Sequence, residues 1–132
     1  MTIKKEIRTL LENTYGNILT TKLESGETEF AYHADYLDHP FLLLVQIDEA
    51  QALLVMSIMF TDNKTDQLLL DQEELQLLRE LYPNYYVEMI DQTLVLTDAI
   101  NFLKDTYSIQ FVENRLSNLE TEAYKISEKI YE

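Results

Sequence analysis

Residues 41–60 read FLLLVQIDEAQALLVMSIMF, and this stretch decides the fold. Fifteen of its twenty residues are apolar, yet Asp48 and Glu49 stand at its centre. A transmembrane helix needs about 20 largely uncharged residues, and a charged centre costs several kcal/mol in a bilayer. Two β-strands that reverse at Asp48-Glu49-Ala50-Gln51 explain the stretch better. The sequence therefore predicts a central β-hairpin.

The predicted hairpin pairs Ile47 with Ala52, and this register gives it two unequal faces. One face is wholly apolar and brings together Phe41, Leu43, Val45, Leu54, Met56 and Ile58. The other face carries Leu42, Leu44 and Val55, diluted by Gln46 and Ser57. A strand pair this apolar is expected at the centre of a sheet with at least one side fully covered.

Length and composition indicate one ordinary domain over residues 1–132. The apolar fraction of 46%, with nine Tyr and five Phe, is enough for a core. Cysteine is absent, which excludes disulfides, thiolate metal sites and Cys nucleophiles and suits a reducing cytoplasm. The first residues alternate charged with single apolar side chains, so no signal peptide is expected there.

The formal charge of −14 is spread along the chain. Such a field repels phosphate backbones and anionic membranes, so we expect neither nucleic acid nor membrane as a partner. Basic or amphipathic protein partners are permitted, and so is mimicry of nucleic acid. Alternatively, the acidity serves only to keep the protein in solution.

Three helices are predicted, over residues 2–15, from Asp71 to Pro83, and over residues 108–131. The first has Thr2 to cap its start, Gly16 just past its end, and an apolar stripe of Ile3, Ile7, Leu10, Leu11 and Tyr15. The second opens with a capping box of Asp71 and Glu74 and a hydrophobic staple of Leu70 and Leu75. Its apolar arc is wide, which predicts contact with more than one surface. The arc consists of Leu75, Leu77, Leu78, Leu81 and Tyr82.

The third helix carries an apolar seam with alternating spacings of three and four: Ile109, Val112, Leu116, Leu119, Ala123, Ile126 and Ile130. This pattern fits a coiled coil or an amphipathic helix that lies across a sheet. We favour the sheet, because a large apolar sheet face needs a cover.

Two further hairpins flank the central one. The first turns at Ser25-Gly26 with Glu24 opposite Glu27, and its strand from Tyr32 leads to Pro40, after which the central hairpin is expected to begin. The other joins residues 85–90 to 93–97. Residues 98–104 either continue the second strand or form a loop. The fold class is thus α+β, an antiparallel β-sheet of five to six strands covered by helices, in the order α-β-β-β-β-α-β-β-α.

The sequence does not contain the known catalytic motifs that we compared with it. Only Gly16 and Gly26 exist, so no glycine-rich phosphate loop is present. Four residues, His33, Asp35, Asp38 and His39, could bind a divalent metal or supply a base, but a polar surface loop explains them equally well. We therefore predict no catalytic residue, no metal and no cofactor.

The element order and the stretches DQEELQLLRELYPNYYVEMIDQTLVLTDAI (71–100) and NRLSNLETEAYKI (114–126) resemble the YbjN family, which is similar in fold to small acidic type III secretion chaperones. The resemblance implies a non-enzymatic cytoplasmic protein, often a homodimer through its middle helix. In those chaperones, apolar patches hold a partner's segment in extended form. Carried over, the dimer candidates are Leu77, Leu78 and Leu81, and the partner-binding candidates are Leu42, Leu44, Leu53 and Val55.

The sequence is therefore compatible with three functions. The first is a protein-binding module, favoured by surplus apolar surface, unless the first helix covers the second face of the central hairpin. The second is an acidic inhibitor or immunity-type protein that meets a basic partner. The third is a small metal-binding enzyme built on residues 33–39.

Overall fold

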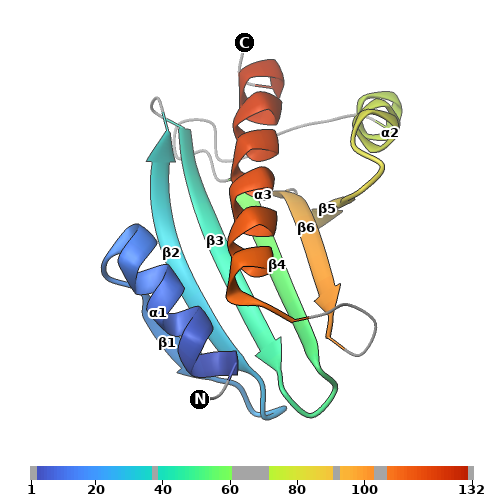
Figure 1. The fold of residues 1–132 in the computed structure, drawn as a ribbon. Helices are drawn as coiled ribbons and strands as arrows, with labels where there is room; N and C mark the ends of the chain where they lie inside the picture. The colour runs from blue at the N-terminus through green and yellow to red at the C-terminus, as the bar shows by residue number, and fades with distance from the viewer. Residues whose placement is uncertain (1–2, 37–38, 61–71, 91–92, 103–106, 131–132) are drawn as a thin grey trace.

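A computed structural model of the protein describes residues 3–36, 39–60, 72–90, 93–102 and 107–130 (Figure 1). The fold is α+β, and its element order is the predicted one. The elements are α1 (Ile3–Tyr15), β1 (Leu19–Lys22), β2 (Thr28–Tyr36), β3 (His39–Asp48), β4 (Leu53–Phe60), α2 (Gln72–Leu81), β5 (Tyr86–Ile90), β6 (Thr93–Asn101) and α3 (Ile109–Ile130).

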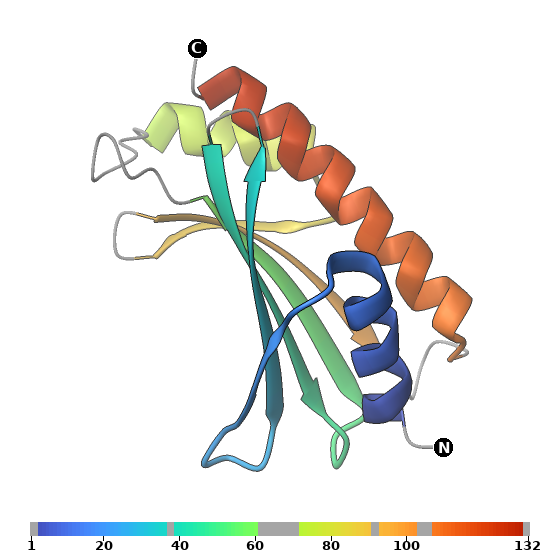
Figure 2. The ribbon, with the colours of Figure 1, turned by 90° about the vertical axis from the view of Figure 1, so that its left-hand side faces the viewer.

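The six strands form one antiparallel sheet in the order β1-β2-β3-β4-β6-β5. Helix α1 packs against β2 and α3, while α3 packs against β4 and β6. Figure 2 shows α1 and α3 on the same side of the twisted sheet. We call this side the inner face and the opposite side the outer face.

The central hairpin forms as predicted, but the predicted register is wrong by two residues. Ile47 pairs with Leu54 rather than Ala52, and the loop runs over residues 49–52. Ala52 takes a left-handed backbone with a φ of 53°, and Asp48 Oδ1 accepts the Gln51 N–H at 3.1 Å. A shift of two preserves the side-chain alternation, so the apolar face is the predicted one.

The first hairpin is shifted by one residue from the predicted pairing of Glu24 with Glu27, so each β1 side chain lies on the opposite face from the one that this pairing implies. Thr21 pairs with Glu29, and the Leu23 N–H donates to the Glu27 carbonyl at 2.8 Å. Gly26, with a φ of 94°, completes a three-residue turn in which Glu24 cannot face Glu27. All four β1 residues are exposed, so no burial opposes the slip.

The expectation that the central strand begins after Pro40 is also wrong, because β3 starts at His39 and Pro40 pairs with Asp35. The β3–β4 register begins at Phe41, so within the described residues Pro40 has a ladder partner in β2 alone. An edge-like position of this kind tolerates a missing N–H donor. At the other end of the sheet, β6 continues to Asn101, which settles residues 98–101 as strand.

The third helix lies across the sheet, as favoured over a coiled coil. Its seam residues Val112, Leu116, Leu119, Ala123 and Ile126 are buried in a single core with the inner-face side chains of the strands. Ile7 and Leu11 of α1 join the same core, and Gly16 ends that helix with a φ of 85°. The predicted caps at Thr2 and Asp71 and the staple residue Leu70 lie outside the described residues.

The left-handed backbone of Ala52 gives a test of the corrected loop. Glycine avoids the Cβ clash of this conformation, so Ala52→Gly should raise the free energy of unfolding by up to about 1 kcal/mol. The same change at exposed Ala50, whose φ is not positive, should lower it by about 0.5–1 kcal/mol. Urea unfolding of the two variants measures both effects, and a loss of stability in Ala52→Gly would contradict the loop geometry.

Candidate protein-binding face

The outer face of the sheet is apolar at its centre. Along β4 the side chains alternate between buried and half-buried, and the half-buried ones point away from α1 and α3. The described helices bury their apolar stripes in the inner-face core, and the views agree that they do not lie over the outer face (Figures 1 and 2). The apolar centre of the outer face consists of the half-buried Leu42, Leu44, Leu53, Val55, Met59 and Ala99 around Val95, which is only 4% exposed.

Polar side chains within the outer face satisfy one another. The hydroxyls of Ser57 and Thr97 lie 3.0 Å apart, and Gln46 Nε2 donates to Glu29 Oε2 at 2.9 Å. Such pairs reduce the number of free donors and acceptors that the centre of the face can present. Apolar packing is therefore the main interaction that this surface offers.

The charges of the outer face lie at its margins and are acidic. Glu29 on β2, Asp48 at the end of β3 and Glu88 on β5 share this side of the sheet by register. The strands of the described structure contain one Lys or Arg, Lys22, and it pairs with Thr28, whose side chain is buried on the inner side. The face is thus an apolar strip with an acidic rim.

The four predicted partner-binding residues, Leu42, Leu44, Leu53 and Val55, all lie on this face and are half-buried. The alternative that the first helix covers them does not hold, because Ile7 and Leu11 of α1 are buried in the inner core. Sequence reasoning missed Met59 and Val95. The strict alternation along β4 could have found Met59, but Val95 joins the face through the β4–β6 pairing, which no local pattern reveals.

The three predicted dimer residues of α2 fall on different sides of that helix. Leu78 is 6% exposed and belongs to the core with Leu75 and Tyr82. Leu77 and Leu81 are 56% and 50% exposed and lie one turn apart. Only the latter two are accessible to a second chain.

The residues of the metal hypothesis do not form a described site. His33 is exposed on β2, while Asp35 and His39 pair with Pro40 and Tyr36 in the β2–β3 ladder. Asp38 lies outside the described residues. Among those residues, no group of three or more His, Cys, Asp or Glu side chains is arranged to hold a metal ion.

An ion pair between a buried carboxylate and a half-buried guanidinium, which the sequence did not predict, joins α3 to β6. Asp98 is 3% exposed on the inner face, and Arg115 reaches it with Nε at 2.7 Å from Oδ2 and with Nη2 on Oδ1. The guanidinium also lies 5.4 Å from the ring centroid of Phe111. Burial, followed by the charges of Asp98 and Glu122, raises the pKa of nearby Tyr85. The paired carboxylate fixes α3 on the sheet.

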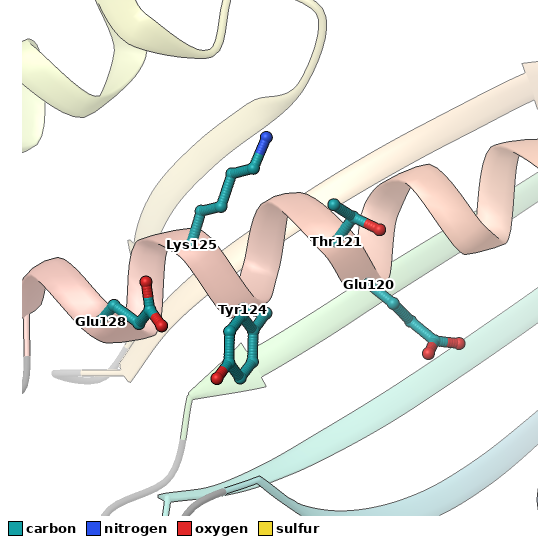
Figure 3. A pocket seen from close by; sticks show the side chains of 5 residues that line it. All are labelled: Glu120, Thr121, Tyr124, Lys125 and Glu128. Atoms are coloured by element: carbon teal, nitrogen blue, oxygen red, sulfur yellow. The ribbon is translucent and has the colours of Figure 1, made fainter.

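A hollow of about 500 Å³ lies along α3, and Figure 3 shows the side chains of α3 that line it. The described residues that line it all come from that one helix: Glu120, Thr121, Tyr124, Lys125 and Glu128. Burial raises the pKa of the Glu120 carboxyl. Among the residues that the structure describes, no second element adds a lining side chain, and no site is assigned to this hollow.

Comparison with protein-family models, with curated proteins and with solved structures found no match for this chain. Within the part of the chain that the structure describes, every helix is too short or too polar to cross a bilayer. The outer face is therefore the candidate site on the strength of its own geometry.

The Asp98–Arg115 pair should matter for stability. Arg115→Met leaves a buried carboxylate without its cation and should lower the free energy of unfolding by about 2–3 kcal/mol. Asp98→Val combined with Arg115→Met removes both charges and should recover most of that loss. Urea titrations of the single and double variants give the coupling, and strictly additive losses would show that the pair is not coupled.

The raised pKa of Glu120 predicts a pH effect. The folded protein holds this proton more tightly than the unfolded chain, so the contribution of Glu120 to stability falls as the pH rises through and above its ordinary value of 4.5. Glu120→Gln should therefore be more stable than the parent at pH 7, and the difference should vanish under acidic conditions. Thermal melts across this range test it, with the exposed Glu128→Gln on the same helix as control.

Proposed function

We propose that this protein is a non-enzymatic protein-binding module that holds a partner polypeptide on the outer face of its sheet. The observation that carries the proposal is the half-buried apolar strip of β3, β4 and β6, over which none of the described helices lies and whose polar neighbours pair among themselves. A contiguous apolar patch on a protein surface marks a site of interaction with another molecule. The YbjN-like and secretion-chaperone resemblance of the sequence supports the same reading.

We further propose that the protein forms a homodimer in the cytoplasm. Leu77 and Leu81 on α2 would supply the apolar contact between two copies, since both are exposed and lie on one side of the helix. Leu78 is excluded from this role by its burial. The lack of cysteine suits the reducing compartment.

The second candidate function is an acidic inhibitor or immunity-type protein. The acidic rim of Glu29, Asp48 and Glu88 and the net charge of −14 favour it. Binding through charge alone would weaken steeply with added salt, whereas apolar capture would not.

Two matched variants separate the two proposed surfaces. Leu44→Thr with Val55→Thr makes the outer face polar while Thr keeps the strand propensity. Leu77→Thr with Leu81→Thr makes the exposed side of α2 polar. We expect the first variant to lose partners recovered by cross-linking in cell extract and to remain dimeric by light scattering.

The second variant should become monomeric and keep its partners. Thermal melts establish that both variants are folded. Partners that survive the outer-face change, or a dimer that survives the α2 change, would remove the corresponding surface from the proposal.

A further inference from the structure

The backbone of the outer face limits the kind of segment that can bind there. Strands β3, β4 and β6 each have a neighbour on both sides, so their N–H and C=O groups are engaged in the sheet ladders. An extended chain laid on this face would find no backbone partners and would leave its own peptide groups unpaired. A helix satisfies its own backbone and needs only a surface for its apolar stripe.

Addition of an extended strand at the sheet edges is also opposed. At the β5 edge, Arg79 Nε donates to the Val87 carbonyl at 2.8 Å, and α2 packs against the strand. The Val87 carbonyl is thus occupied by a side chain rather than open to an incoming strand. At the other edge, β1 has four residues, which is a short template for pairing.

The charge of the outer face favours one kind of occupant among those whose backbone groups are already hydrogen-bonded. A second copy would stack two acidic rims, each on a chain of net charge −14, with no Lys or Arg on either outer face within the described strands. A helix with Lys or Arg beside its apolar stripe would instead place cations near Glu29, Asp48 and Glu88.

The sheet sets the length of that helix. Strands β3 and β4 pair over eight residues, from Phe41↔Phe60 to Asp48↔Leu53. At about 3.3 Å per residue this ladder is about 26 Å long, which corresponds to about 17 helical residues. The inner face already shows the arrangement, because α3 crosses it with a continuous apolar seam.

We propose that the outer face binds one amphipathic helix of about 17 residues from another protein, apolar on the side that meets Leu44 and Val55 and basic along its flanks. This inference rests on the proposed binding function and names the class of partner.

Three synthetic peptides of about 18 residues test it by fluorescence anisotropy. The first is helical with a Leu stripe and Lys flanks. The second has Glu in place of Lys, and the third is the Lys peptide with two central prolines that prevent a helix. We expect the first to bind about tenfold or more tighter than the other two, because prolines break the helix and Glu flanks would face the acidic rim.

Leu44→Thr with Val55→Thr should weaken binding of the first peptide by about tenfold, and Leu77→Thr with Leu81→Thr should not change that binding.

If the proline peptide binds as tightly and its binding depends on Leu44 and Val55, the occupant is extended. The helix proposal is then wrong and the binding function stands. Binding that ignores the Leu44 and Val55 changes would be bulk charge attraction and would overturn the helix proposal. A dimer dissolved by these changes would make the occupant a second copy. If no peptide binds, both the helix and the outer-face function fail.

Discussion

The whole structure depends on the burial of one side of a sheet whose central strands are apolar on both sides. Phe41, Leu43, Val45 and Ile47 alternate with Leu42 and Leu44 along β3, so no single layer of helices can cover them all. The helices of the described chain meet on the inner face, where α3 and α1 complete the core. Because the described helices are all engaged on the inner face, none of them lies over the outer face.

Much of the fold was predictable because the decisive patterns are local. The alternation of β3 and β4 and the three-four spacing of α3 each identify a buried side without any knowledge of partners. Strand registers were less accessible, because they depend on the conformations of single turn residues. The left-handed Ala52 lengthened one loop, and the shape of the turn at Gly26 shifted the other hairpin. In β1 the shift reversed the faces, since four exposed residues impose no preference.

The candidate site was predictable in part for the same reason. Leu42, Leu44, Leu53 and Val55 follow from the central hairpin alone, whose two-residue shift left every side chain on its predicted face. Val95 and the Asp98–Arg115 pair required the position of β6 beside β4, with α2 and β5 between them in the sequence. An aspartate in an apolar strand looks like a break in the pattern until the arginine that neutralises it comes from another element.

Helix α1 packs against α3, although nearly the whole chain separates them, and the Tyr107 hydroxyl just before α3 donates to Glu6 of α1. Burial and the bond to Glu6 raise the pKa of Tyr107, so the phenol stays protonated as the donor. During synthesis on the ribosome, α1 emerges before α3, and its contact with α3 can form only after α3 has been made. Contacts of such large sequence separation slow folding and keep apolar surface open meanwhile. Completion of the inner core therefore waits until α3 has left the ribosome.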